Sequence, residues 1–361
     1  MFKKNFDNKT VLVTGHTGFK GSWLSIWLKT MGANVIGLSL DPITNPSLFD
    51  VCNLNQDLES HKIDIRESDK VKNLISSIKP DYIFHLAAQS LVRNSYTDPL
   101  KTWTTNLIGT INVLNSLRFL DKKCISIFIT SDKCYDNLEW TWGYRENDKL
   151  GGEDPYSASK GSCELAIRSY VKSFFTSNQN ILIGSARAGN VIGGGDWAEN
   201  RIIPDCIRAW SASKPVSLRN PISTRPWQHV LEPLSGYLKQ AVMMNENSTK
   251  FHGEAFNFGP PSSQNISVLE LVETMSKYWS KVRWNIENND KNDLFESGLL
   301  KLNCDKALHL LNWQATLDFE KTVKMTVEWY RDYYNDPLNA KNKTLEQISE
   351  YVSISNKDKT K

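Results

Sequence analysis

The sequence of 361 residues is long enough for two lobes that share a cleft. Its formal net charge of +3 is close to balance, which argues against nucleic acid or a membrane surface as the partner. Six cysteines occur without C-x-x-C pairing or metal-ligand spacing, so we expect no metal and a reducing, cytoplasmic location. The polar N-terminus has no secretory segment, and no stretch approaches the length of a membrane span.

A glycine-rich loop follows the first expected strand, residues 10–14, and leads into a helix expected over 18–31. In this G-x-x-G-x-x-G pattern the first glycine permits a tight turn, the second lets a pyrophosphate approach the backbone, and the third allows close helix packing. The helix N-terminus adds free N–H groups for phosphates. An ordinary βα turn is the weaker alternative. We therefore assign the whole loop to dinucleotide binding: Gly15, His16, Thr17, Gly18, Phe19, Lys20 and Gly21.

Other segments of the same half are candidates for the rest of the dinucleotide. Asp41, at the end of a strand over 34–40, could accept hydrogen bonds from an adenosine ribose and disfavour a 2′-phosphate, which favours NAD over NADP. A turn role before Pro42 is an alternative of nearly equal weight. We expect the adenine near Asp64 and Ile65. Small residues that follow the next buried strand would let the cofactor pass close to the backbone: Leu86, Ala87 and Ala88.

The hydrophobic pattern alternates strands with helices through the first half of the chain. The expected strands are 10–14, 34–40, 61–63, 81–85, 124–130 and 180–186, and the expected helices are 18–31, 67–79, 98–120 and 156–177. Such alternation is typical of an α/β fold with a doubly wound parallel sheet. A return helix at 229–244 and a strand-like segment at 255–258 are expected to rejoin this sheet.

We therefore divide the chain into two lobes and a tail. The dinucleotide-binding lobe comprises 1–186 plus 229–258, and a smaller mixed α/β lobe comprises 187–228 plus 259–340. A polar tail over 341–361 is expected to contain a short helix at 344–352 and a frayed end. The apolar positions of the helices at 98–120 and 156–177 suit either a cover for the sheet or a four-helix interface, which would make a homodimer or a tetramer.

A short central segment holds the groups that carry chemistry. Tyr156 and Lys160 are four apart and share one helix face, so the ammonium can lower the pKa of the phenol and make it a base. Ser131 is the third expected member. Asp132 and Lys133 add ionisable groups that a plain alcohol oxidation does not need, which indicates further proton transfers. A surface helix with a long lysine is the common alternative for so short a motif, and the glycine loop argues against it.

With these motifs placed, the chain resembles the extended short-chain dehydrogenase/reductase superfamily, and within it the branch of CDP-glucose 4,6-dehydratases. The resemblance covers about residues 8 to 335. Five segments carry it: TGHTGFKGSW from Thr14, TSDK from Thr130, Tyr156 with Lys160, RAGNVIGGGDW from Arg187, and RPWQHV from Arg225. The last two are the most specific.

The resemblance implies a second lobe that binds a nucleotide diphosphate-sugar, CDP-glucose, beside NAD. Asn190 would hydrogen-bond a diphosphate oxygen, and Arg219 and Arg225 would neutralise its charge. Trp197 would offer a face to a base or sugar, with core packing as an equal alternative. The other residues assigned to the substrate are Gln89, Ser90, Arg201 and Gln228.

The implied reaction gives a 4-keto-6-deoxy sugar, a precursor for bacterial surface polysaccharide such as the O-antigen of lipopolysaccharide. Tyr156 would take the 4-hydroxyl proton as hydride leaves C4, Ser131 would bond the same oxygen, and Asp132 would protonate the departing C6 hydroxyl. Better-known dehydratases carry a glutamate where this chain has Lys133, so the base for the C5 proton is open. Asn106 is expected to support the active-site lysine through backbone and water.

Three other functions share parts of this pattern. A nucleotide-sugar 4-epimerase needs no acid beside the serine, so Asp132 and Lys133 argue against it. A reductase that exchanges NADPH with solution would yield a product that has lost no water. A dinucleotide-binding sensor without catalysis typically lacks the Tyr156 and Lys160 pair, which is intact here.

Overall fold

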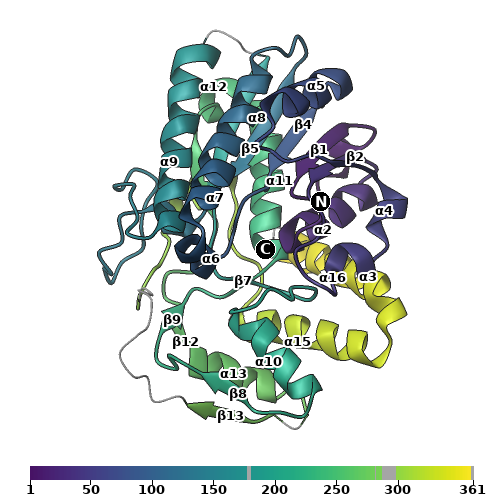
Figure 1. Ribbon diagram of the computed structural model, residues 1–361, viewed down its shortest axis with the longest axis vertical. Helices are drawn as coiled ribbons and strands as arrows, with labels where there is room; N and C mark the ends of the chain where they lie inside the picture. Colours follow the sequence, from purple (N-terminus) through teal and green to yellow (C-terminus); the bar gives the residue numbers. More distant parts are fainter. Residues whose placement is uncertain (177–179, 281, 287–297, 359–361) are drawn as a thin grey trace.

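A parallel sheet of seven strands forms the centre of the computed structural model, which describes residues 1–176, 180–280, 282–286 and 298–358. The strand order is β11-β6-β5-β4-β1-β2-β3 (Figure 1). The strands are β1 (Thr10–Thr14), β2 (Asn34–Ser39), β3 (Glu59–Lys62), β4 (Tyr82–His85), β5 (Cys124–Ile129), β6 (Ile181–Arg187) and β11 (Ala255–Asn257). Every neighbouring pair is parallel, and the order reverses between β1 and β4. The predicted doubly wound α/β fold is confirmed.

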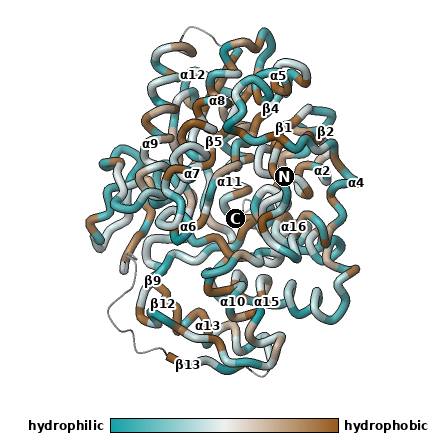
Figure 2. Tube along the Cα trace, viewed as in Figure 1, coloured by the Kyte–Doolittle hydropathy of each residue, from teal (hydrophilic) through white to brown (hydrophobic). Residues whose placement is uncertain are grey.

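Helices cover both faces of this sheet because successive strand residues point to opposite sides. Val11 and Val13 pack in the core that contains Trp23, whereas Leu12 packs in a second core with Leu114. The first face is covered by α2 (Phe19–Thr30) and α11 (Leu231–Glu246), and the second by α5 (Ser68–Ile78), α8 (Gly109–Leu117) and α9 (Pro155–Tyr170). Figure 2 shows hydrophobic residues gathered around β5 and α8.

The segment expected as one helix over 98–120 is helical from Pro99 to Leu117, with a π-helical turn in its middle. It comprises α7 (Pro99–Trp103), a π-helical turn η1 (Thr104–Ile108) and α8, and an unpredicted helix α6 (Val92–Thr97) precedes it. Asp98 starts α7 afresh, since its Oδ1 accepts the Lys101 N–H at 3.0 Å and Pro99 follows it. The π turn carries Asn106 inward, where it is buried. A second π turn, η3 (Val171–Phe175), ends α9.

The smaller lobe is built from short paired strands and helices that lie beyond the carboxyl edge of the sheet (Figure 1). The pairs are β7 (Val191–Ile192) with β10 (Gln228–His229), β8 (Val216–Leu218) with β13 (Trp284–Ile286), and β9 (Thr224–Arg225) with β12 (Ile266–Ser267). Its longer helices are α10 (Ile202–Ser211), α13 (Val268–Ser276) and α15 (Phe319–Asn335), whereas α14 (Asp305–Leu311) packs against β11 and α11. The remaining short elements are α1 (Lys3–Phe6), α3 (Leu48–Val51), α4 (Leu54–Asp57), η2 (Asp132–Cys134), α12 (Ser248–Phe251) and η4 (Pro337–Asn339).

The helix expected over 344–352 is present but longer than expected, and it is not a solvated tail; the last residues, 359–361, lie outside the described ranges. Residues 340 to 358 form one helix, α16 (Ala340–Asp358), that packs against the first lobe. Tyr351 is fully buried, its ring lies edge-on to Trp27 with centroids 5.7 Å apart, and its hydroxyl donates to Glu232 Oε2 at 2.8 Å. The lysine-rich composition obscured the apolar face that Ile348 and Tyr351 form.

Glu232 lies where α16 meets α11. We expect its carboxyl group to make the free energy of unfolding depend on pH. Its Oε1 accepts the N–H groups of Thr316 and Leu317, and burial raises the pKa of this carboxyl to about 7. The unfolded chain loses this proton at lower pH, so the free energy of unfolding should fall as pH rises from about 4.5 to 7, by on the order of 3 kcal/mol. Urea unfolding across this range measures the slope.

The variant Glu232→Gln keeps the acceptor oxygen and removes the ionisation, so its unfolding free energy should vary less with pH than that of the wild type. Glu273→Gln, at an exposed position on α13, is the matched control and should keep the wild-type slope. Equal slopes in the wild type and Glu232→Gln would contradict the assignment.

Within the ranges that the structure describes, no helix combines the length and the apolar character needed to cross a membrane.

Candidate active site

The glycine loop after β1 has the geometry that a phosphate-binding turn requires. Gly15 has φ +74°, and a Cβ there would lie 2.8 Å from the Ala87 nitrogen, while a Cβ on Gly21 would lie 2.0 Å from the Gly15 oxygen. A Cβ on Gly18 would meet only the Gly15 oxygen, at 3.4 Å. Gly15 and Gly21 are therefore required by packing, whereas Gly18 opens onto free space at the start of α2. The loop fits the pyrophosphate of NAD.

Two side chains of the loop point back onto the sheet. The His16 ring lies over Gly37, its Nε2 is 2.7 Å from Ser60 Oγ, and burial lowers the pKa of the imidazole to about 4. Thr17 Oγ1 lies 2.8 Å from Ser39 Oγ. These side chains attach the loop to β2 and β3. We therefore expect His16 and Thr17 to contact NAD through their backbone atoms.

The residues assigned to the adenosine end fall into two kinds. Asp41 follows β2 as expected and pairs with Lys62, with both side chains exposed. Asp64 accepts a hydrogen bond from Arg66 Nε at 3.0 Å, which lowers the pKa of its carboxyl. Ile65 is buried against Gly109 on α8. After β4, the backbone lies against the end of β1: Leu86 N donates to Thr14 O at 3.1 Å, Ala87 N donates to Thr14 Oγ1 at 3.1 Å, and Ala88 follows half-buried.

Ser131, Asp132, Tyr156 and Lys160 meet at the carboxyl edge of β5, and all four are buried. Ser131 Oγ donates to Asp132 Oδ1 at 3.0 Å and also hydrogen-bonds Tyr156. Burial raises the pKa of Tyr156 to about 12, while the Ser131 hydrogen bond and the charge of Arg201 act in the opposite direction. Burial likewise lowers the pKa of Lys160. Ser131, Asp132 and Tyr156 therefore lie together, with Lys160 buried one turn further along α9, and burial has the largest influence on the pKa of the phenol.

The segment after β6 positions the side chain of Asp132. A Cβ on Gly189 would lie 1.8 Å from Asp132 Oδ2, so only glycine fits, and Asn190 Nδ2 donates to the same oxygen at 3.3 Å. Gln228 Nε2 donates to the carbonyl oxygens of Gly189 and Phe258, each at 3.0 Å. The resemblance assigned Asn190 and Gln228 to the substrate. In the structure Asn190 contacts Asp132, and Gln228 contacts the backbone of Gly189, which packs against Asp132.

Lys133 follows this cluster in the chain. Its backbone N–H donates to Ser131 Oγ at 3.2 Å, and the residue is half-buried. It lines a small hollow together with Asp154 and Ser157 at the start of α9.

Asn106 joins the loop after β4 to the catalytic helix. Gln89 N donates to Asn106 Oδ1 at 2.8 Å, and Asn106 Nδ2 donates to Gln89 O at 3.1 Å and to Ser159 Oγ at 2.9 Å. Ser159 precedes Lys160, so Asn106 supports the lysine through its neighbour on α9. Gln89 Oε1 accepts a hydrogen bond from the Leu91 N–H at 2.6 Å, and Ser90 is exposed.

Trp197 lies in the core of the smaller lobe, which favours packing over a contact with a base or sugar. Its ring is buried, with centroids 5.7 Å from Trp329, 5.8 Å from Tyr330 and 5.0 Å from Tyr333. Four large aromatic rings stabilise the core of the smaller lobe, and this is the packing alternative that the sequence left open.

Of the predicted arginines, one reaches the catalytic cluster. Arg201 Nη1 lies 2.8 Å from Asp196 Oδ2, and its charge acts on Tyr156 and Lys20. Arg225 is buried and donates from Nη1 to Thr224 O at 2.8 Å and to Gly298 O at 3.2 Å. Arg219 follows β8, within electrostatic reach of Asp205.

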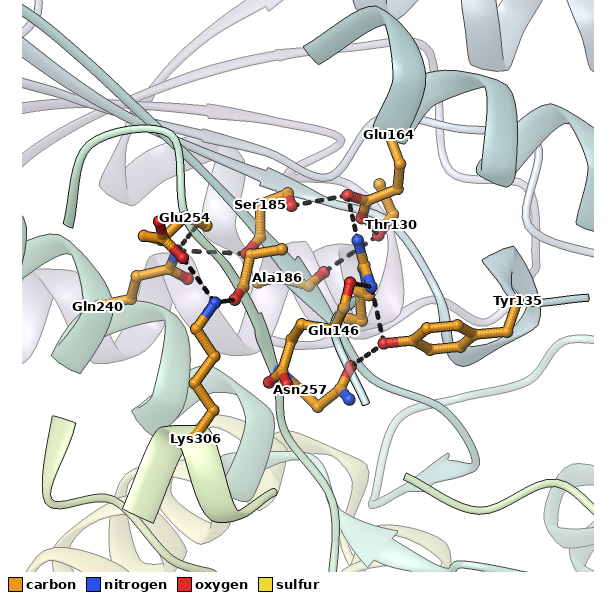
Figure 3. Close-up of polar contacts among 12 residues, drawn as sticks. Thr130, Tyr135, Glu146, Glu164, Ser185, Ala186, Gln240, Glu254, Asn257 and Lys306 are labelled. Carbon is orange, nitrogen blue, oxygen red and sulfur yellow. Dashed lines mark hydrogen bonds and ion pairs between the residues drawn. The ribbon is translucent and has the colours of Figure 1, made fainter. Parts of the chain in front are cut away.

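A buried ion pair beneath the site escaped the sequence analysis. Glu164, one turn after Lys160, lies 2.9 Å from Arg187 Nη2, and both side chains are 4% exposed. Figure 3 shows Thr130 and Ser185 donating to Glu164, at 2.5 and 2.9 Å. In the sequence, the four-residue spacing from Lys160 to Glu164 was the signal that could have indicated a carboxylate on the same helix face. No group of three or more histidine, cysteine or acidic side chains in the described ranges is arranged to hold a metal ion.

Comparison with known proteins identifies the family. The GDP-mannose 4,6 dehydratase family matches residues 12–326. The chain is 45% identical to CDP-glucose 4,6-dehydratase of Salmonella typhimurium, over 98% of this chain and 99% of that protein. It is 27% identical to UDP-glucose 4-epimerase of Mycoplasma pneumoniae, with 90% and 97% covered.

The fold is shared with solved structures. An NAD-bound UDP-glucose 4-epimerase of Stenotrophomonas maltophila has a TM-score of 0.76 at 20% identity, with 91% of this chain and 99% of that chain covered. From the match over most of its length and the near-complete coverage of the Salmonella relative, the chain belongs to the GDP-mannose 4,6 dehydratase family.

Proposed function

We propose that this protein is an NAD-dependent nucleotide-sugar 4,6-dehydratase that converts CDP-glucose to CDP-4-keto-6-deoxyglucose and water. The observation that carries the proposal is the buried carboxyl of Asp132, held beside Ser131 and Tyr156 by Gly189 and Asn190. Epimerisation needs no such acid. The 45% identity to a CDP-glucose 4,6-dehydratase supports the same choice.

The residues divide the proton transfers among them. NAD, when bound, takes the hydride from C4 of the sugar and returns it at C6. Tyr156 accepts the proton of the 4-hydroxyl, and Ser131, which hydrogen-bonds this phenol, orients the same oxygen. The resulting C4 ketone acidifies the C5 proton, which a base removes while Asp132 gives a proton to the C6 hydroxyl as it leaves. After hydride has been added at C6, a proton must return to C5. Lys160 holds the cofactor and its charge favours the phenolate.

The direct test is incubation of the purified protein with NAD and CDP-, dTDP-, UDP- or GDP-glucose. We expect loss of one water, by mass, with CDP-glucose and no net reduction of NAD. A product of unchanged mass would indicate an epimerase, and stoichiometric consumption of reduced cofactor would indicate a reductase.

Asp132→Asn should separate oxidation from water loss. The amide keeps the side chain's shape but cannot supply the acidic proton, so elimination should slow by about 10² to 10⁴-fold while hydride transfer from C4 continues. Absorbance of reduced cofactor should then accumulate in a single turnover. If deuterium at C4 no longer reached the cofactor, the acid role would be misassigned.

Lys133 is the candidate base for C5 that the sequence left open. It lines a hollow at the start of α9, next to the segment that contains Tyr156. In Lys133→Met, solvent exchange of the C5 proton in the oxidised intermediate should fall by about 10²-fold or more if lysine is the base. Unchanged exchange assigns the role to another group.

We further propose that the protein acts as a homodimer. Leu100 on α7, Ile108 on η1 and Leu165 on α9 are 73%, 43% and 55% exposed. These large apolar side chains lie on adjoining elements, as a four-helix interface requires. Cytoplasmic location and supply of a deoxysugar precursor for O-antigen remain predictions.

A further inference from the structure

Tyr237 brings an unused hydroxyl to the edge of the catalytic cluster. It lies on α11, its side chain is fully buried, and its hydroxyl has no hydrogen-bond partner among the described residues. Its ring lies edge-on to Phe258, with centroids 5.8 Å apart, and that packing fixes the direction of the side chain. A buried hydroxyl without a partner is costly, so a polar group that enters beside it would gain a hydrogen bond.

The surroundings of this hydroxyl are those of the active site. Burial raises the pKa of Tyr237 well above its usual value, and the carboxylate of Asp132 and the phenol of Tyr156 raise it further. The Tyr237 hydroxyl therefore lies within electrostatic reach of two groups to which it is not bonded. A polar ligand atom between them would meet three hydrogen-bonding side chains.

The direction from which Tyr237 enters indicates which ligand this is. Its helix, α11, covers the same face of the sheet as α2, the helix that follows the glycine loop. Lys20, in that loop, places its Nζ 5.9 Å from the centre of the Tyr237 ring, and its charge interacts with those of Lys160 and Asp132. Lys20 is a flexible side chain, half-buried between the ring and the loop.

A dinucleotide whose phosphates lie at Gly18 and whose hydride acceptor lies beside Tyr156 must pass this point. We propose that Tyr237 is a further cofactor-binding residue, whose hydroxyl hydrogen-bonds the nicotinamide half of NAD, at the carboxamide or at the adjoining ribose. The proposal rests on the NAD dependence of the proposed function. It does not rest on the identity of the sugar.

Tyr237→Phe tests this by removing one oxygen. We expect the dissociation constant for NAD, measured by fluorescence titration of the purified protein, to rise about tenfold, with that for ADP unchanged. ADP-ribose, which keeps the second ribose and lacks the nicotinamide, separates the two contact points. Unchanged ADP-ribose affinity assigns the bond to the carboxamide, and a matching loss assigns it to the ribose.

Two controls distinguish a loss of NAD contact from a general effect of the substitution. Tyr82→Phe removes the same atom from a buried tyrosine at the amino end of β4, away from the carboxyl edge of the sheet, and should leave NAD binding unchanged. Tyr237→Phe should unfold in urea at the wild-type concentration or higher, because its hydroxyl has no partner to lose.

Unchanged NAD affinity in Tyr237→Phe, equal losses for NAD and ADP, or a lower urea midpoint would each overturn the proposal. A rise confined to KM for the nucleotide sugar would do the same, by assigning the hydroxyl to the substrate. Failure of the proposed dehydration would appear in the assay of water loss and would leave these titrations interpretable.

Discussion

Turnover of Tyr156→Phe should fall by about 10³-fold or more, because the variant removes the group that we propose accepts the 4-hydroxyl proton. The first oxidation should stop, so neither reduced cofactor nor dehydrated product should form in a single turnover. The phenol is buried and hydrogen-bonded to Ser131, so water cannot readily take its place. Rapid-quench measurement of product and absorbance of reduced cofactor test both statements.

The pH dependence of the wild type provides an independent check on the same residue. Because burial raises the pKa of Tyr156 to about 12, its base form is scarce at neutral pH until cations approach it. The rate of C4 oxidation should therefore rise with pH. Tyr170→Phe, which removes the same atom near the end of α9, should retain both the rate and this rise. Near-normal turnover in Tyr156→Phe would remove tyrosine as the base.

The parts of the site that the sequence predicted are those that local spacing determines. The loop from Gly15 to Gly21 and the four-residue step from Tyr156 to Lys160 depend on one turn or one helix, so chain order was sufficient. The parallel sheet followed from alternation for the same reason.

The errors arose where side chains from distant segments meet. Trp197 is packed by three rings more than 130 positions later in the chain, and Gln228 bonds the carbonyl of Gly189, so neither contact leaves a local pattern. The same holds for α16, whose apolar side chains have partners on α2 and α11. Composition described its solvent-facing lysines and missed the face that is buried.

Arg187→Met should be the most destabilising single change considered for this protein, because it leaves the carboxylate of Glu164 buried without its cation. Arg187 also donates from Nη1 to Tyr135 Oη at 2.7 Å and to Glu146 O at 3.0 Å. Loss of one partner of a buried pair typically costs about 3 to 5 kcal/mol, and urea unfolding monitored by circular dichroism should show a loss of that size. A loss below about 1 kcal/mol would mean that Glu164 does not depend on this cation.

The double variant Glu164→Leu/Arg187→Met distinguishes the pair from its surroundings. If the penalty of Arg187→Met comes from the uncompensated carboxylate, the double variant should unfold at a smaller cost than the sum of the two single changes. The hydroxyls of Thr130 and Ser185, which donate to Glu164, would then lack their acceptor, so some loss should remain. Glu164 is one turn from Lys160 on α9, and its negative charge raises the pKa of that lysine against the effect of burial.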